Sequence, residues 1–140
     1  MIFPEENIEA VAYLFESTVG STLDETQLNC VKKAGITQSD VPALVRALKN
    51  SVQNIRAADC GYRSKVYWAL GKLYSDELLE FFQQMLEKEI GRNVEVAYQI
   101  MIALDNLDEP IFDPGREIFS VLDHKENLKD AMKYIKILQK

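Results

Sequence analysis

The amino-acid sequence predicts an all-α fold, and three observations support that prediction. Apolar residues recur at the helical spacing of three and four positions along most of the 140 residues. No segment shows the sustained alternation of apolar and polar residues that is typical of a half-buried strand. Glycine and proline fall where helices would begin and end. We therefore expect about eight short helices, antiparallel to their neighbours along the chain, in a single domain spanning residues 1–140.

The first half of the sequence predicts three helices separated by turns. The first begins near Pro4, and its apolar pattern ends at Gly20. The second follows a predicted capping box between Thr22 and Glu25 and ends at Gly35. The third has a long apolar stripe that consists of Val41, Leu44, Val45, Leu48, Val52 and Ile55.

Three further helices follow in the middle of the chain. The apolar spacing of residues 64–74 predicts the first of them. Ser75 caps the next helix, which ends at Gly91, because a serine side chain can accept a hydrogen bond from the first turn. Asn93 caps the sixth predicted helix in the same way.

The last part of the sequence predicts two more helices. Asp113 and Pro114 indicate the start of a short seventh helix. Its apolar residues are Ile118, Phe119 and Leu122. Asp123 and Glu126 have the spacing of a capping box and predict the start of the final helix.

Two of the predicted helices share a pattern at an offset of 34 residues. The offset places Val66, Ala69, Leu70 and Leu73 on Ile100, Ala103, Leu104 and Leu107. With these residues, about residues 62–112 resemble HEAT-like helical repeats. The chain departs from the family's pattern at Ala97, where the family has arginine, and at Asp105, where it has glycine. The resemblance implies helices stacked as a small HEAT-like α-solenoid, and an irregular helical bundle is the alternative.

Charge and apolar run lengths restrict the partners of the chain. Sixteen basic and 22 acidic residues give a net charge of −6, which disfavours direct binding to nucleic acid. The longest apolar run, residues 10–15, is far shorter than the ~20 residues of a membrane-spanning helix. Basic residues are absent before Lys32, unlike the start of a secretory signal. We expect a cytoplasmic protein without a membrane partner, with Cys30 and Cys60 as reduced thiols.

Residues suited to catalysis are scarce. His124 is the single histidine, so neither a two-histidine metal site nor a histidine relay can form. The sequence contains no glycine-rich phosphate loop, and its acids lack the spacing of a calcium-binding loop. We therefore expect a protein that is not an enzyme and has no cofactor, metal or small-molecule substrate. A small lyase or hydrolase that uses carboxylates is the alternative left open.

Acidic residues are concentrated in residues 95–123, which contain seven acids and a single basic residue, Arg116. A turn between helices commonly presents a binding surface in helical-repeat proteins, which favours a basic protein partner here. The predicted partner-binding residues are Asp105, Asp108, Glu109, Asp113, Glu117 and the potential aromatic anchor Tyr98. Helix capping and solubility are the alternative explanation for the acids. Five lysines on one face of the last helix, partly offset by Glu126 and Asp130, are a weaker candidate for an anionic partner.

In its size, repeat type and acidity the chain resembles the helical immunity proteins of bacterial toxin–immunity systems, including contact-dependent growth inhibition. This resemblance implies that the chain binds a cognate toxin domain inside the cell and neutralises it by blocking its active site. The implied toxin is basic and is often a nuclease. The alternative function is a helical-repeat adaptor that scaffolds or regulates another protein.

Overall fold

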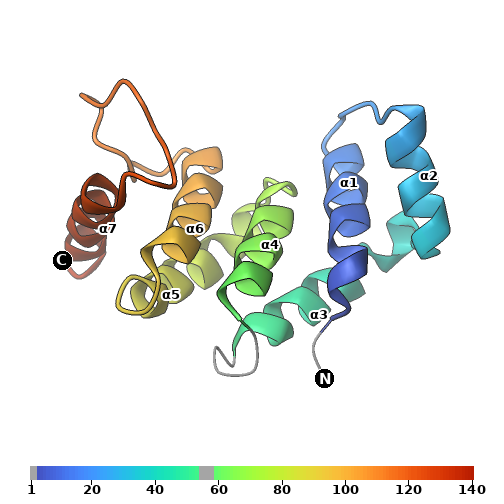
Figure 1. The fold of residues 1–140 in the computed structure, drawn as a ribbon, viewed down its shortest axis with the longest axis horizontal. Coiled ribbons are helices and arrows are strands. Elements are labelled where there is room, and N and C mark those ends of the chain that lie inside the picture. The colour runs from blue at the N-terminus through green and yellow to red at the C-terminus, as the bar shows by residue number, and fades with distance from the viewer. Residues whose placement is uncertain (1–2, 54–58) are drawn as a thin grey trace. The chain divides into compact units, whose positions relative to one another are not determined.

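A computed structural model describes residues 3–53 and 59–140 of the chain (Figure 1). In these residues the regular structure consists of seven α-helices and three short 3-10 helices, without strands, which confirms the predicted all-α class. The chain divides into two compact units, Met1–Tyr74 (unit 1) and Ser75–Lys140 (unit 2). A single domain spanning residues 1–140 stays a prediction.

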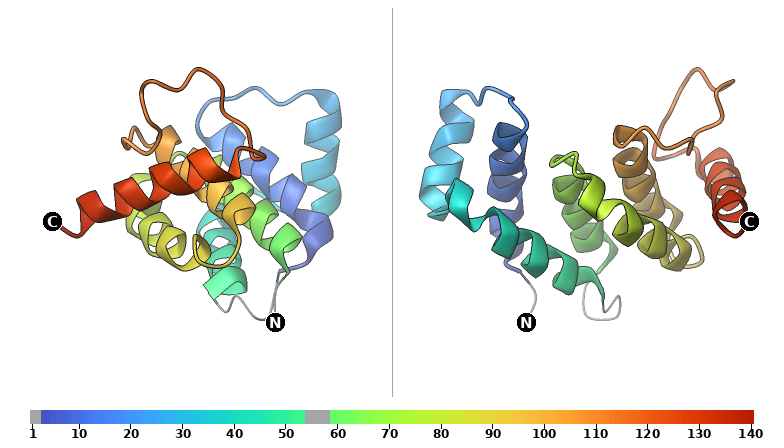
Figure 2. Two further views of the ribbon diagram at one scale, coloured as in Figure 1. Left: turned by 60° about the vertical axis from the view of Figure 1, so that its left-hand side comes forward. Right: turned by 180° about the vertical axis from the view of Figure 1, so that it is seen from behind.

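Unit 1 is organised around its first α-helix. Its elements are η1 (Glu5–Asn7), α1 (Ile8–Thr18), α2 (Glu25–Ala34), η2 (Gln38–Asp40), α3 (Val41–Gln53) and α4 (Cys60–Gly71). Helix α1 packs against α2, α3 and α4, as Figures 1 and 2 show. A helix with neighbours on several sides has to be apolar on several sides. The buried side chains of α1 are accordingly Ile8, Ala10, Val11, Ala12, Leu14 and Phe15.

The start of α2 differs from the prediction, while its end agrees with it. The capping box joins Asp24 and Gln27, so the predicted box between Thr22 and Glu25 is wrong. Asp24 occupies the N-cap position, and its carboxylate accepts a hydrogen bond from the Gln27 amide at 2.8 Å. Gly35 ends the helix with a left-handed φ of 71°, which glycine adopts without steric cost.

Helix α4 begins earlier than the sequence suggested. Asp59 caps it by accepting a hydrogen bond from the Tyr62 amide at 2.8 Å, so the helix starts at Cys60 instead of Ser64. Cys30 and Cys60 are both free thiols. Ile55, the last residue of the stripe predicted for the third helix, lies outside the described residues.

Unit 2 contains η3 (Asp76–Leu78), α5 (Leu79–Glu89), α6 (Val94–Asn106) and α7 (His124–Leu138). The three α-helices all pack against one another. The Ser75 hydroxyl and the Asn93 amide oxygen accept hydrogen bonds from the first turns of η3 and α6, which confirms both predicted caps. The large buried side chains of this unit include Phe82, Met85, Leu86, Ile100, Met101, Leu104 and Tyr134.

The predicted seventh helix is wrong, because residues 107–123 form a loop without helical turns (the 107–123 loop). Asp113 accepts from the Gly115 amide at 2.8 Å, and Ser120 accepts from the Leu122 amide at 3.1 Å, so each side chain closes a local turn. A short helix containing glycine is marginal on its own, so the local sequence gives this segment little support for a helix. The described residues therefore contain seven α-helices, against the eight expected.

The predicted capping box at the start of α7 is also absent. Asp123 occupies the N-cap position but makes no side-chain hydrogen bond to the helix. Its carboxylate lies instead 3.7 Å from the guanidinium of Arg116. The partner of the Asp123 carboxylate is thus the charged Arg116, and not the backbone amides of the first helical turn.

Candidate functional site

The 107–123 loop begins with a regular helix ending. The Asp108 amide donates to the carbonyl of Asp105 at 2.9 Å, and the Glu109 amide donates to the carbonyl of Leu104 at 3.1 Å. These two bonds define a Schellman motif, in which the residue after the cap is left-handed. Asp108 fills that position with a φ of 62°, which aspartate tolerates better than most residues. The motif leaves the side chains of Asp105 and Asp108 exposed at the end of α6.

Aromatic contacts attach the first part of the loop to α6. The ring centroid of Phe112 lies 6.1 Å from that of Tyr98 and 4.9 Å from that of Phe119. Tyr98 is only 9% exposed, and this burial raises the pKa of its phenol. Tyr98 therefore supports Phe112 from α6, and its part in partner binding stays a prediction.

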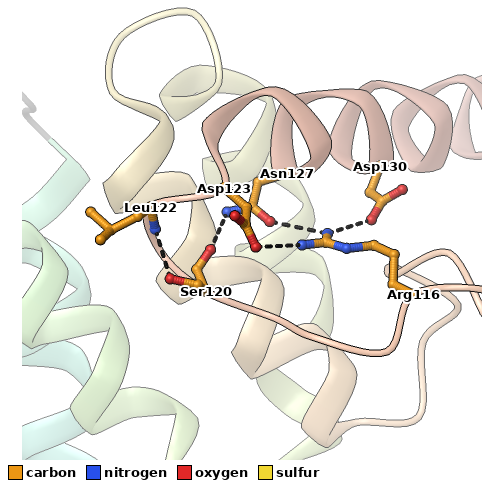
Figure 3. A network of polar contacts seen from close by, with 6 residues as sticks. All are labelled: Arg116, Ser120, Leu122, Asp123, Asn127 and Asp130. Carbon is orange, nitrogen blue, oxygen red and sulfur yellow. Dashed lines mark hydrogen bonds and ion pairs between the residues drawn. The ribbon is translucent and has the colours of Figure 1, made fainter.

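Arg116 connects the loop to α7 through a buried ion pair (Figure 3). Its guanidinium donates to the carboxylate of Asp130 at 2.8 Å and to the side-chain oxygen of Asn127 at 3.1 Å. The side chains of Arg116 and Asp130 are 9% and 4% exposed. Charge-assisted hydrogen bonds of this kind are strong and directional. Arg116 thus fixes the loop against the first two turns of α7.

The same guanidinium also organises the second half of the loop. Its carbon lies 5.6 Å from the ring centroid of Phe112 and 5.0 Å from that of Phe119, within the range of cation–π attraction. Asn127, which accepts from Arg116, donates to the carbonyl of Ser120 at 2.9 Å. Figure 3 shows this chain of contacts from Arg116 through Asn127 to Ser120. We call the contacts of Arg116 with Phe112, Phe119, Asp123, Asn127 and Asp130 the Arg116 clamp.

Two of the five predicted partner-binding acids have structural contacts within unit 2. Glu109 accepts a hydrogen bond from the hydroxyl of Tyr134 at 2.6 Å, and that hydroxyl accepts one from Gln83 at 2.9 Å. Burial, together with the bond to Glu109, raises the pKa of Tyr134 to about 12. Asp113 accepts from the Gly115 amide. Both carboxylates therefore shape the loop.

The other three predicted acids, Asp105, Asp108 and Glu117, are exposed. Of the five, Asp105 and Asp113 come together at a cavity of about 280 Å³, which is also lined by Phe112 and Phe119. Asp108 and Glu117 do not line that cavity. The acids are thus distributed over the loop and the end of α6, and do not converge on a single point.

Exposed apolar side chains in the loop are the feature that the sequence did not indicate. Ile118 and Leu122 are 76% and 72% exposed, and Phe119 is 43% exposed. These three residues, which were expected to form the apolar stripe of a helix, are therefore exposed in the loop. Exposed apolar groups bordered by charge are typical of protein-binding surfaces. The loop surface therefore consists of Asp105, Asp108, Glu117, Ile118 and Leu122.

Two observations concern metal binding and the single histidine. Across residues 3–53 and 59–140, no three His, Cys, Asp or Glu side chains are grouped as a metal site would require. His124 lies 3.6 Å from Glu95, and both side chains are about half exposed. The exposed charged and apolar residues of the loop surface can instead bind a macromolecule.

Comparisons of the chain with protein-family models, with curated proteins and with solved structures find no match. In the part of the chain that the structure describes, no helix combines the length and apolar character needed to cross a bilayer.

Proposed function

We propose that this chain is an immunity protein that binds a cognate toxin domain in the cytoplasm and blocks its active site. The single observation that carries the proposal is a loop that is held by a buried ion pair while Asp108, Glu117 and apolar side chains remain exposed. The resemblance to HEAT-like immunity proteins supports it, and we propose the stacked, solenoid arrangement on the same basis. In this proposal the chain performs no chemistry and binds no nucleic acid, membrane or small molecule.

The loop surface suits a basic toxin in two ways. Exposed carboxylates of Asp105, Asp108 and Glu117 would meet the lysines and arginines with which a nuclease holds substrate phosphate. Ile118 and Leu122 would supply the apolar contacts that keep a complex together once water is excluded. Because the clamp fixes the loop before binding, less conformational entropy is lost when the partner arrives.

The proposal is tested first by isolating the partner. Affinity purification from the native host, at low salt and at ~1 M salt, should yield one tightly bound basic protein with toxin activity. Isolation of a large mixed assembly would favour the helical-repeat adaptor instead. The isolated partner is then used to measure association and dissociation rates with purified variants.

Charge is tested by the variant Asp105→Lys/Asp108→Asn/Glu117→Lys, which spares the structural carboxylates Glu109 and Asp113. Because charge steers encounter, its association rate should fall by ~10-fold or more at low salt, and the loss should shrink at ~1 M salt. The matched control is Glu6→Gln/Glu25→Lys/Glu87→Lys, which makes the same change in net charge at other exposed positions. The control should retain the parental rate. Equal slowing of both variants would contradict a role for the loop.

Apolar contact is tested by Ile118→Ala/Leu122→Ala. Since both side chains are mostly exposed, the variant should fold normally and keep its association rate. Its dissociation from the partner should accelerate by ~10-fold or more, independently of salt. Cells that produce the toxin should be protected less well by this variant than by the parent. Full protection combined with parental kinetics would place the interface elsewhere.

A further inference from the structure

Helix α7 has a side that no helix of unit 2 covers. On one side it packs against α5 and α6 (Figure 2). Its buried residues include Asn127, Ala131 and Tyr134. On its other side, Leu128 and Met132 are 37% and 48% exposed. All residues of unit 2 belong to the described part of the chain, so this exposure is not caused by a missing segment of the unit.

Two of the four exposed apolar residues of α7, Leu128 and Met132, have the spacing of a helix–helix seam, while Ile137 and Leu138 are exposed elsewhere on the helix. Leu128, Met132 and Ile135 follow one another at intervals of four and three residues, as positions a and d do in a coiled coil. Ile135 is 8% exposed and lies where this strip meets the buried side. A strip limited to these positions is narrow and fits the side of one other helix. A bilayer surface requires a broader apolar face.

Lysines border this strip, and the structure shows that their charge is less compensated than the sequence suggested. Lys125, Lys129, Lys133, Lys136 and Lys140 are all exposed. Asp130 does not offset them, because it is buried and bonded to Arg116, which leaves Glu126 as the exposed acid of α7. None of the five lysines forms an ion pair with any residue that the structure describes.

We propose that α7 is a docking surface for an acidic amphipathic helix of another protein. The apolar residues of that helix would pack on Leu128 and Met132. Its carboxylates would meet Lys129 and Lys136, which directly follow seam positions and so occupy the flank where coiled coils place their interhelical ion pairs. This surface goes beyond the proposed toxin-binding loop, because its charge is opposite and it selects a different partner.

The seam and its charge favour this occupant over others. Nucleic acid binds through phosphate contacts, which require the lysines but no apolar strip between them. A second copy of α7 would bring lysines against lysines, which is destabilising. An acidic amphipathic helix can pack its apolar residues on the strip and pair its carboxylates with the lysines beside it.

The direct test uses a synthetic helix of about three heptads with leucine at positions a and d and glutamate at e and g. Repulsion among its glutamates keeps this acidic peptide from pairing with itself. The control peptide has lysine in place of glutamate. Isothermal titration at low salt should show that the full chain binds the acidic peptide at least ~10-fold more tightly than the basic one, because like charges repel across such a flank.

Charge reversal on α7 should exchange this preference. Lys129→Glu/Lys136→Glu should bind the basic peptide more tightly than the acidic one. The matched control Lys88→Glu/Arg92→Glu makes the same charge change at exposed positions at and after the end of α5, and it should still prefer the acidic peptide. An unchanged preference in the α7 variant would overturn the proposal.

The apolar strip is tested by Leu128→Gln/Met132→Gln, which should weaken binding of the acidic peptide by ~10-fold or more. Ile137→Gln is the control, because Ile137 is 50% exposed and lies two and a half helical turns from Leu128, on the opposite side of α7. It should bind as the parent does. Circular dichroism confirms that each variant is folded.

Three further results would overturn the proposal. These are no binding of the acidic peptide, equal binding of both peptides, and binding that the seam variant does not weaken. Vesicles of phosphatidylcholine and phosphatidylserine and a single-stranded RNA are titrated in parallel. Binding to either of these without binding to the acidic peptide would assign the lysines to a membrane or to nucleic acid. The toxin-binding loop is unchanged in all α7 variants, so failure here leaves the proposed function standing.

Discussion

Helices α4 and α6 are each followed by a residue with a left-handed φ, but the chain segments that come next differ. Tyr74 and Asp108 lie at the same offset of 34 residues as the repeated helical pattern, and both have a left-handed φ, 49° and 62°. The amide of Leu73 donates to the carbonyl of Leu70, as the amide of Leu107 donates to that of Leu104. After α4 the chain begins η3 and α5 directly, whereas after α6 it forms the 107–123 loop.

The difference lies in what each segment can bury. After Tyr74, Ser75 caps a new helix whose apolar residues Leu78, Phe82 and Leu86 are almost fully buried. In the 107–123 loop, Ile118, Phe119 and Leu122 are exposed, and the buried Arg116 has its partner Asp130 on α7. A shared left-handed residue after the helix thus does not determine the next element. The element depends on what the following segment buries, which is apolar residues after Tyr74 and a charged pair after Asp108.

The largest effect should come from removing the charged pair that holds the loop. Arg116→Ala leaves Asp130 buried without its partner, and it should lower the free energy of unfolding by about 3–5 kcal/mol. Lys65→Ala is the comparison in unit 1, where the Lys65–Glu5 pair at 3.0 Å is about half exposed. Its loss should stay below about 1 kcal/mol. Urea unfolding measures both, and similar losses in the two variants would show that the clamp does not stabilise the loop.

A smaller effect is expected at Tyr134, which ties Glu109 to the core of unit 2. Tyr134→Phe removes the hydrogen bonds with Glu109 and Gln83 and should cost about 1–2 kcal/mol at neutral pH. The pKa of Tyr134 is raised from 10.0 to about 12 because the folded protein favours the neutral phenol. This contribution is therefore complete below pH 10 and is lost as the pH rises through about 12.

Denaturation across this alkaline range tests the sign of that shift. The parent should lose stability between pH 10 and about 12, and Tyr134→Phe should lose less. Some loss should remain in the variant, because the bond to Glu9 also raises the pKa of Tyr13 to about 12. Parallel pH profiles for parent and variant would contradict the assignment of Tyr134.

The smallest effect is expected at the two left-handed helix ends. Glycine adopts a positive φ without the steric cost of a side chain. Tyr74→Gly should raise the free energy of unfolding by about 0.5–1 kcal/mol, and Asp108→Gly should raise it by less, since aspartate tolerates this conformation. Thermal unfolding measures both changes. A loss of stability in either variant would mean that the side chain contributes more than its backbone conformation costs.

The parts of the fold that were predicted from sequence depend on neighbouring residues. Gly35, Ser75 and Asn93 were recognised because a cap acts within one helical turn. The box predicted for Asp123 failed because a more distant residue, Arg116, is the partner of that carboxylate. Spacing alone identifies which contacts are possible, but it does not rank a local partner against a distant one.

The candidate site was only partly predictable for the same reason. Its acidity and its place between two helices were readable from the charge pattern. The clamp was not, because Arg116 binds residues 11 and 14 positions further along the chain. The hydrogen bond between Glu109 and Tyr134 could not be predicted either, because Tyr134 lies 25 positions further along the chain. Ile118 and Leu122 were expected on a helix, and their exposure could not be predicted because that helix does not form.

The central claim is that the Arg116 clamp holds residues 107–123 as a loop. Nuclear magnetic resonance of the whole chain tests it most directly, through the Cα chemical shifts of residues 113–122 and the nuclear Overhauser contacts of Arg116. We expect non-helical shifts throughout this range, together with contacts between the Arg116 side chain and the rings of Phe112 and Phe119. A continuous run of helical shifts across residues 113–122, without those ring contacts, would contradict the claim.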